Sequence, residues 1–443
     1  MPPHNPSLQS RFRLPTTFRA LRHPNYALWF IGQGVSLIGT WMQSMAQQVL
    51  IFQMTGSAAA LGLMSFIGLL PVIPLSLWGG SITDRFSKKK VIILTNAGML
   101  FQALLLALLA WSNRIEVWHV YVLSFFLAAL NAVDIPARQA FTLDLIEGKE
   151  DLANAIGLNS AMFNGARALG PAMAGIVVAA LGVMWAFMIN AFSFVAVIIC
   201  LLLMRNLPQP PQKEKTLSVI SHLAEGFRYV RSNQMVLILF SVIGVSAFLS
   251  MPYSTLMPVY AETNLKESAR PIVDILCGYI KCQTPEALPL GILLTMVGIG
   301  ALIGALFVAA LPANAPYGKL LTLGNLGFPL LLLIIAFSHS FILSSFVLLF
   351  VGISFVLQNA LVNTLLQFSV RDELRGRVMS LYSMIFQSMM RFGSFQAGYF
   401  ADWFGASLSV ALGAVVSLAY GIFIAVRFGL HKQNRITDFY ETK

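Results

Sequence analysis

Four ionisable side chains interrupt long apolar stretches of this sequence, and they are the residues most able to do chemistry: Asp134, Arg138, Arg167 and Arg391. Asp134 and Arg138 are four residues apart, so a helix would place them on one face, although Pro136 between them could kink it and spoil the pair. We hypothesise that Asp134 binds and releases a proton, and a structural ion pair is the alternative. An arginine keeps its proton, so Arg167 and Arg391 could bind an anionic or oxygen-rich molecule, or bond neighbouring helices.

Uncharged polar residues recur in the same apolar stretches and could contact the same molecule. Such residues more often form hydrogen bonds between helices, which is the alternative for each of them. Beside the two arginines, the predicted binding residues are Gln43, Gln47, Gln48, Asn131, Asn159, Asn164, Gln358, Asn359, Asn363 and Gln387.

The composition places these residues in a membrane. The 443 residues are 57% hydrophobic and 11% charged, which leaves too little polar surface to cover a soluble globule. From Pro24 to Thr83 there is no Asp, Glu, Lys or Arg, and about 20 apolar residues suffice to cross a bilayer. Because unpaired backbone amides are too costly in lipid, each apolar stretch is predicted to be a helix. Twelve such helices are expected, at residues 26–54, 57–82, 91–112, 117–141, 153–180, 183–204, 234–261, 288–311, 320–337, 341–367, 378–401 and 407–428.

An even number of crossings puts both chain ends on one side of the membrane, and the basic residues indicate which side. Of the 29 Lys and Arg residues, 22 fall in segments on the side of the chain ends, and only 4 fall in the opposite loops. Both termini are therefore predicted to be cytoplasmic. The first 24 residues contain arginines and prolines but no apolar core, so no secretory signal peptide is expected.

An internal repeat supplies the expected architecture. A shift of 223 residues places Gly170 on Gly393 and Gly182 on Gly405, within two similar predicted helices. The repeat predicts an all-α integral membrane protein, with two pseudo-symmetric six-helix bundles around a central cavity. The expected parts are an N-terminal segment (1–24), the first bundle (25–206), a cytoplasmic linker with an amphipathic helix (207–233), the second bundle (234–428) and a cytoplasmic tail (429–443).

A short polar turn follows the second predicted helix and carries one acid among several bases. Asp84 can cap the neighbouring helix and pair with Arg85 or Lys88, which would lock the two bundles together on the cytoplasmic side. The alternative is a turn that only ends a helix and follows the charge rule. The predicted cytoplasmic gate consists of Gly80, Asp84, Arg85, Lys88, Arg138 and Arg375.

These motifs, in their order and spacing, resemble the major facilitator superfamily over nearly the full chain. The segment Gly80–Lys90 resembles the superfamily's loop signature after the second helix, with Ser87 where a second glycine is usual. Other fragments resemble the bacterial branch that contains the enterobactin exporter and macrolide efflux proteins. They are Phe18–Arg22, Thr55–Ser57, Asp134–Gln139, Asn164–Arg167, Gly170–Pro171 and Arg375–Val378.

The resemblance implies a secondary active transporter of the bacterial inner membrane. Such a protein exports a small amphipathic organic molecule of the drug or siderophore class, usually by proton antiport with alternating access. Gly170 and Pro171 would then form a helix hinge. Of the superfamily's antiporter signature only Gly170, Pro171 and Gly175 are clearly present, and the first helix has Thr40 after its glycine where some relatives have an acid. This departure weakens the account of proton coupling that the resemblance implies.

The cysteines predict one covalent link. Cys277 and Cys282 lie in a long loop, at about residues 262–287, that the charge rule places on the oxidising outer side. We expect a disulfide that closes the short segment between them. Cys200 falls in the sixth predicted helix, where a small apolar role is expected.

Other classes of protein fit the sequence less well. The six histidines are scattered, and none is paired at metal-ligand spacing, so we expect no enzyme, no metal site and no cofactor. A Gly-rich nucleotide-binding loop is missing and the bases are spread along the chain, which argues against ATP and nucleic acid as partners. The expected partners are the lipid bilayer, protons and a small molecule, and the chain is expected to act as a monomer. An importer, a lysophospholipid carrier of the same fold and a non-transporting membrane sensor are the alternatives.

Overall fold

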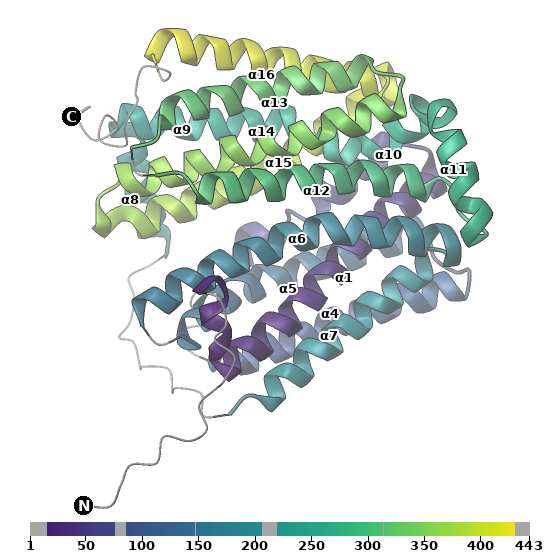
Figure 1. Cartoon of the computed structure of the whole chain (residues 1–443), viewed down its shortest axis with the longest axis horizontal. Helices are drawn as coiled ribbons and strands as arrows, with labels where there is room; N and C mark the ends of the chain where they lie inside the picture. The colour runs from purple at the N-terminus through teal and green to yellow at the C-terminus, as the bar shows by residue number, and fades with distance from the viewer. Residues whose placement is uncertain (1–15, 76–85, 147, 206–218, 313, 430–443) are drawn as a thin grey trace, which may run out of the picture.

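The computed structural model describes residues 16–75, 86–146, 148–205, 219–312 and 314–429, and the regular structure of these residues is helical. Figure 1 shows the helices running roughly parallel, in two groups. The helices of the first half are η1 (Thr16–Arg22), α1 (Pro24–Thr55), α2 (Ala58–Ile67), α4 (Lys88–Trp111), α5 (Val117–Asp144), α6 (Lys149–Leu181) and α7 (Val183–Leu203). Those of the second half are α8 (Val219–Ser232), α9 (Gln234–Val245), η2 (Ser246–Ser250), α10 (Tyr253–Thr263), α11 (Lys266–Ile280), α12 (Ala287–Ala309), α13 (Tyr317–Phe337), α14 (Phe341–Ser369), α15 (Asp372–Phe404) and α16 (Ala406–Phe428).

The described helices are long and apolar enough to cross a membrane many times. Ten segments meet this description, among them Gln234–Thr263, in which α9, η2 and α10 form one crossing. Helices α1 and α15, of 32 and 33 residues, are longer than a crossing requires and complete the set of twelve. The predicted all-α membrane fold is therefore confirmed, and each observed crossing overlaps its predicted range.

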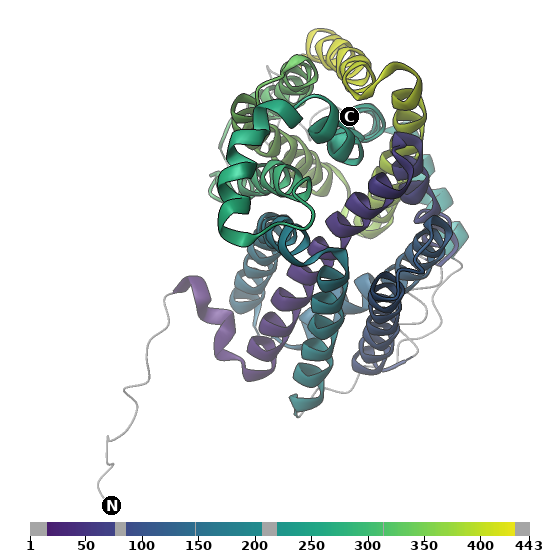
Figure 2. The ribbon, with the colours of Figure 1, turned by 90° about the vertical axis from the view of Figure 1, so that its right-hand side faces the viewer.

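The two ends of the bundle can be told apart by what lies there. Helix η1 and the last turn of α16 lie at one end, which we call the terminal face, on the left in Figure 1. Helix α11 lies at the opposite end, which we call the far face, and it is seen on the right in Figure 1. Figure 2 views the molecule from the far face. The terminal face is the end that the sequence predicts to be cytoplasmic.

Two glycines each form a one-residue connection between helices, and the internal repeat relates them. Gly182 separates α6 from α7 with a φ of 87°, and Gly405 separates α15 from α16 with a φ of 86°. A positive φ of this size is costly for a residue with a Cβ atom, so glycine suits both turns. Position 405 follows position 182 by the 223 residues of the repeat, so the two halves use the same turn at equivalent places.

Small residues bring the two halves together in the part of the bundle nearest the far face. Helix α6 packs on α12, where a Cβ atom added at Gly291 would lie 2.7 Å from the Cα atom of Gly175. Helix α15 packs on α2, where a Cβ atom at Gly62 would lie 2.5 Å from the carbonyl oxygen of Ser394. Such small residues allow membrane helices to approach backbone to backbone. The halves are therefore closely packed near the far face.

Helix α8 belongs to the predicted linker and packs on the second half. Arg377 of α15 forms an ion pair with Glu225, and Gly226 approaches the backbone of the same arginine. Val230 is buried, whereas Phe227 is exposed. The linker residues 206–218 lie outside the described residues.

Candidate functional site

A cavity of about 800 Å³ lies between the two halves. Helices α1, α2 and α5 line it from the first half, and α10 and α15 line it from the second half. On α5 and α15 the lining extends to Gln139 and Met379, within two turns of the ends of these helices at the terminal face. A cavity of this volume is large enough for a drug-sized molecule.

The wall of the cavity mixes neutral polar groups with flexible apolar side chains and carries one charge. Arg391 is the only ionisable side chain that lines it in the described part of the chain. Methionine adapts to ligands of different shape because it is unbranched and polarizable. The polar lining residues are Thr40, Ser44, Gln47, Gln48, Ser65, Ser124, Asn131, Gln139, Thr255, Ser380, Ser383, Gln387 and Ser388, and the methionines are Met64, Met379, Met384 and Met390.

Five of the residues predicted to bind a small molecule do line this cavity: Gln47, Gln48, Asn131, Gln387 and Arg391. Gln47 donates from Nε2 to Ser124 Oγ at 3.2 Å. Asn131 donates from Nδ2 to the carbonyl oxygen of Leu127 at 2.9 Å. Arg391 has no hydrogen-bond or ion-pair partner among the described residues.

Gln43 and Gln358 lie inside their own halves and not in the cavity. Gln43 donates to Gln102 Oε1 at 3.0 Å and accepts a hydrogen bond from Asn190 Nδ2 at 2.7 Å, which joins α1, α4 and α7. Gln358 donates from Nε2 to Asn325 Oδ1 at 2.7 Å, which joins α14 and α13. The amides of these two residues bond helices of a single half in this structure, and their contact with a bound molecule stays a prediction.

Four further residues predicted to bind do not line the cavity: Asn159, Asn164, Asn359 and Asn363. Asn159 Oδ1 accepts a hydrogen bond from the Tyr26 hydroxyl at 3.1 Å, and Asn359 Oδ1 accepts one from the Tyr382 hydroxyl at 3.0 Å. Asn164 donates to the backbone of its own helix, and Asn363 accepts from Gln367 of its own helix. These amides also act within one half of the protein.

Asp134 lies in a buried polar cluster inside the first half and does not line the cavity. Its carboxylate accepts hydrogen bonds from Thr95 Oγ1 at 2.5 Å and from Asn96 Nδ2 at 3.3 Å, and it forms an ion pair with Arg138 Nε. Arg138 also donates to Asn96 Oδ1 at 3.1 Å and to Gln33 Oε1. We call these five residues the Asp134 cluster. It joins α1, α4 and α5.

The Asp134 cluster forms although a proline lies within it. Helix α5 continues through Pro136, and the pair at positions 134 and 138 keeps the i to i+4 geometry. The guanidinium carbon of Arg138 also lies 6.0 Å from the centre of the Trp29 ring, within the range of a cation–π contact. The charged groups of Asp134 and Arg138 therefore both have their partners within the first half.

Arg167 reaches from α6 across the interface between the halves. Its guanidinium carbon lies 5.5 Å from the centre of the Phe355 ring on α14. Phe355 packs on Phe328, which packs edge-on against Tyr253 of α10. The Nε and Nη2 atoms of Arg167 are enclosed and have no hydrogen-bond partner among the described residues. Arg167 therefore contacts aromatic rings of the second half and does not line the cavity.

Asp402 joins the two halves at the far face. This residue lies in the last turn of α15, and its carboxylate accepts hydrogen bonds from Ser57 Oγ and from the backbone amide of Ala58, each at 2.6 Å. Ser57 is the N-cap of α2. A carboxylate is favoured there because the first amides of a helix are unpaired and carry partial positive charge.

A second set of hydrogen bonds joins the halves at the same face. The backbone amides of Gln283 and Thr284 donate to the carbonyl oxygen of Ala179, near the end of α6, at 2.6 and 3.0 Å. Sequence reasoning identified neither this contact nor that of Asp402. A serine just before α2 is a signal for a helix cap, but no sequence pattern indicated that the other half supplies a carboxylate to it.

Three of the residues predicted to form the gate at the terminal face, Lys88, Arg138 and Arg375, form hydrogen bonds within their own halves. Gly80, Asp84 and Arg85 lie outside the described residues. Lys88 donates to both carboxylate oxygens of Asp144, at 2.8 and 2.7 Å, which joins α4 to α5. Arg138 belongs to the Asp134 cluster, and Arg375 Nε donates to the carbonyl oxygen of Gln367 at 2.9 Å. These hydrogen bonds of Lys88, Arg138 and Arg375 therefore do not cross between the halves.

The predicted hinge residues are located in a continuous helix. Helix α6 extends through Gly170 and Pro171 from Lys149 to Leu181. Gly170 packs against Trp41 of α1, where a Cβ atom would collide with the indole side chain. In this conformation the glycine provides a close approach of two helices within the first half.

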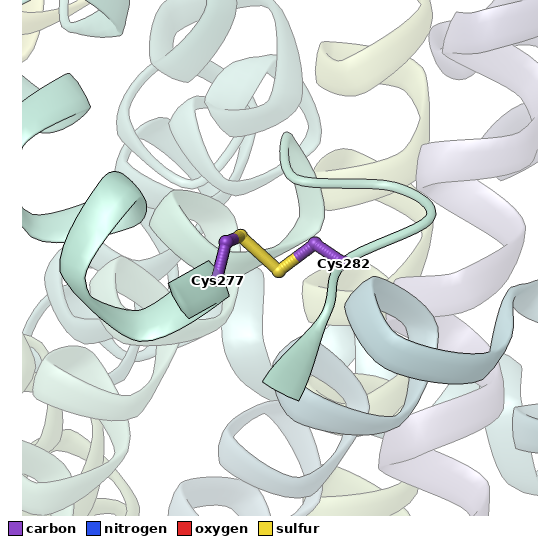
Figure 3. Close-up of a disulfide and its surroundings, with 2 residues drawn as sticks. All are labelled: Cys277 and Cys282. Carbon is purple, nitrogen blue, oxygen red and sulfur yellow. A yellow bond between two sulfur atoms is a disulfide. The ribbon is translucent and has the colours of Figure 1, made fainter. Parts of the chain in front are cut away.

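A disulfide joins Cys277 at the end of α11 to Cys282 (Figure 3), with the Cα atoms 5.0 Å apart. The bond closes the turn that leads into Gln283 and Thr284, the two residues that donate to Ala179. It thus lies at the far face, next to one of the contacts between the halves. Cys200 is a free cysteine in α7. The described residues contain no group of three or more His, Cys, Asp or Glu that could hold a metal ion.

Comparisons with known proteins agree with this geometry. Residues 15–439 match the family model described as transmembrane secretion effector. The chain is 24% identical over 379 residues to the staphyloferrin A transporter of Staphylococcus aureus, an alignment that covers 85% of this chain and 89% of that protein. It is 25% identical over 368 residues to the enterobactin exporter EntS of Shigella boydii serotype 18, covering 82% of this chain and 81% of that protein.

Solved structures of other transporters share the fold. A bacterial homologue of the human lysosomal transporter Spinster, in an inward-facing and unoccupied conformation, superposes with a TM-score of 0.65 at 13% identity, covering 97% of this chain and 99% of that one. A peptide transporter of the POT type superposes with a TM-score of 0.72 at 12% identity, covering 93% of this chain and 96% of that one. At such identities the likeness shows the fold alone.

Proposed function

This chain belongs to the transmembrane secretion effector family of the major facilitator superfamily, and on that premise we propose that it exports a small amphipathic organic molecule of the siderophore or drug class. The export direction follows the family description and the enterobactin exporter among its relatives. We further propose that it resides in the bacterial inner membrane with both termini in the cytoplasm, because the basic residues concentrate in segments of the terminal face.

One observation carries the proposal: both halves line the cavity of about 800 Å³, and the hydrogen bonds between the halves in the described part of the chain lie at the far face. Transport by alternating access requires a chamber whose two ends are closed in turn, by tilting one half against the other. Here Asp402 and Ala179 tie the halves at the far face, and the lining of the cavity reaches to within two turns of helix ends at both faces. The hydrogen bonds at the far face support a state in which the two halves are held together at that face.

We propose that coupling to protons acts through the Asp134 cluster. Asp134 does not touch the cavity, so a proton on it would not meet the cargo directly. Protonation would weaken its pairing with Arg138, and Arg138 holds Gln33 of α1 and Asn96 of α4. Both α1 and α5 line the cavity, so release of the arginine would change the packing of two lining helices. In this proposal the carboxylate acts on the shape of the cavity.

Replacement of Asp134 tests the coupling. With the Asp134→Asn variant, everted membrane vesicles should lose the dependence of efflux on an imposed proton gradient, because the amide cannot take up and release the proton. Asp144→Asn provides a matched control, since Asp144 pairs with Lys88 at the edge of the same helix. Normal uphill efflux by Asp134→Asn, with an unchanged pH profile, would contradict proton coupling through this residue.

A cross-link across the far face tests alternating access. We would introduce Ser57→Cys and Asp402→Cys in a Cys200→Ser background, since the wild-type side chains are in contact. Oxidation should stop efflux from cells and reduction should restore it, because the far face can no longer open.

A matched pair within one half controls for the chemistry of oxidation. Asn264 donates to Ser407 Oγ at 2.8 Å, at the same face but entirely within the second half. The Asn264→Cys/Ser407→Cys variant should stay active when oxidised. Full efflux by the oxidised Ser57→Cys/Asp402→Cys protein would exclude alternating access through the far face.

A further inference from the structure

The charge of the cavity points to the class of molecule that it accepts. Arg391 is the only ionisable side chain lining the cavity among the described residues, and the structure gives it no counter-ion there. A charge without a partner at membrane depth is costly, so such residues usually face a water-filled path or a partner. For Arg391 the facing space is the cavity itself.

Gly68 of the first half lies next to the guanidinium group of Arg391. A Cβ atom added at Gly68 of the first half would lie 2.9 Å from Arg391 Nη1. The backbone of Gly68 is in the ordinary helical region, with a φ of −63°, which any residue can adopt. A side chain at position 68 would therefore have to displace the flexible end of the Arg391 side chain.

The groups around Arg391 suit an oxygen-rich molecule. Gln387 and Ser388 precede it on α15 by about one turn, and Ser65 precedes Gly68 on α2. Amide and hydroxyl groups donate hydrogen bonds to carboxylate, hydroxyl or carbonyl oxygens. A guanidinium group binds a carboxylate with two parallel hydrogen bonds, which adds geometric selectivity to the charge.

A purely structural role does not explain the surroundings of Arg391. Arg138 shows what a structural arginine looks like in this protein, since it has an ion pair, two further hydrogen bonds and an aromatic contact inside one half. Arg391 has none of these polar partners among the described residues, although serines and a glutamine line the same wall. Its guanidinium group is therefore available to a molecule in the cavity.

We propose that Arg391 anchors an anionic group of the cargo, so that the cavity selects anionic, oxygen-rich amphiphiles and disfavours cations. This inference rests on the proposed function, since it names the chemical class of the exported molecule. The described lining contains no acid that could pair with a cationic molecule. The apolar remainder of such a cargo would contact the methionines of the wall.

Two dyes with related ring systems and opposite charge test the selectivity. Carboxyfluorescein is an anion and rhodamine 6G is a cation, and the binding of each to the purified full-length protein can be followed by fluorescence anisotropy. Carboxyfluorescein should bind the wild type more tightly, and Arg391→Gln should weaken its binding by about tenfold or more, as expected for the loss of a hydrogen bond between charged groups. Rhodamine 6G should bind the Arg391→Gln variant at least as well as the wild type.

Three further variants separate charge from geometry and from folding. Arg391→Lys keeps the charge but not the forked geometry and should give an intermediate affinity for carboxyfluorescein. Gly68→Val should weaken carboxyfluorescein binding by crowding the guanidinium group. Arg427→Gln is the control, since Arg427 lies at the end of α16 and outside the cavity, and it should leave both affinities unchanged.

The outcomes distinguish this inference from the proposed function. If the cation binds as well as the anion, including the case in which neither binds, or if Arg391→Gln changes both affinities equally, the charge selectivity is wrong. If the anion binds selectively but proteoliposomes move no carboxyfluorescein under any gradient, the proposed export is wrong while the selectivity stands.

Discussion

Arg138 and Arg391 are both placed inside the bundle, yet their surroundings are opposite. Arg138 lies within one half, where Asp134, Asn96 and Gln33 meet its donors. Arg391 lies between the halves and meets no such group among the described residues. This difference indicates two roles: Arg138 holds helices of one half together, whereas Arg391 is available to a molecule that enters and leaves the cavity.

Two other residues fall between these extremes. Asp402 is paired, but its partners belong to the other half, so its hydrogen bonds must break whenever the far face opens. Arg167 also crosses to the other half, where the ring of Phe355 lies against its guanidinium group. Strong contacts within a half, and breakable contacts between halves, are what a rocking mechanism requires.

The largest effect should follow from removing the paired arginine. Arg138→Met should destabilise the protein by about 3–5 kcal/mol, because it leaves the buried carboxylate of Asp134 without its ion pair. Chemical unfolding in mixed micelles would measure the loss. The double variant Asp134→Asn/Arg138→Met should recover most of the stability, since both charges are then gone. An equal loss in the single and double variants would show that the ion pair is not the cause.

A smaller effect is expected for the carboxylate that bridges the halves. Asp402→Asn weakens the acceptor for Ser57 and Ala58 and should shift the balance toward an open far face by about 1–2 kcal/mol. The readout is the labelling rate of a Ser44→Cys reporter in the cavity wall, with an impermeant maleimide added at the far face. The rate should rise at least several-fold. Asn264→Ala, at the same face within one half, should leave it unchanged.

The aromatic contact of Arg167 should contribute about 1 kcal/mol, the usual worth of a cation–π pair that is partly removed from water. A double-mutant cycle of Arg167→Met and Phe355→Leu, followed by thermal unfolding, would isolate this term. The same cycle with Arg167 and Phe346 should give no coupling energy. Phe346 also lies on α14, but its ring packs against that of Phe350. A coupling energy near zero for Phe355 would mean that Arg167 is held by other contacts.

The smallest change in stability should come from replacing Arg391, the arginine that lines the cavity. Arg391→Gln should lie within about 0.5 kcal/mol of the wild type, or be more stable, because it removes a charge that no described residue compensates. Chemical unfolding in mixed micelles, as for Arg138→Met, would measure the change. Destabilisation of Arg391→Gln as large as that of Arg138→Met would remove the distinction between the two arginines.

Much of the fold could be predicted because a bilayer leaves few choices. Apolar runs of sufficient length must be helices there, so the lengths alone gave bounds close to those observed for Val183–Leu203 and Phe341–Ser369. The pair of Asp134 and Arg138 followed from a spacing of four residues. The sequence located the polar residues within helices but could not tell which of them line the cavity. Gln43 and Gln47 lie one turn apart on α1, yet Gln43 lies inside the first half and Gln47 lines the cavity.

The sequence by itself determined which segments cross the membrane, that the two halves are related and where charge is placed in the bundle. These properties depend on local hydrophobicity and on spacing along one helix. Only the tertiary structure decided that Asp402 caps a helix of the other half, that Arg391 faces the cavity and that Asp134 does not. Whether a polar group faces the cavity or the interior of one half depends on how the two bundles pack. Contacts between residues hundreds of positions apart leave no periodic signal in a single sequence.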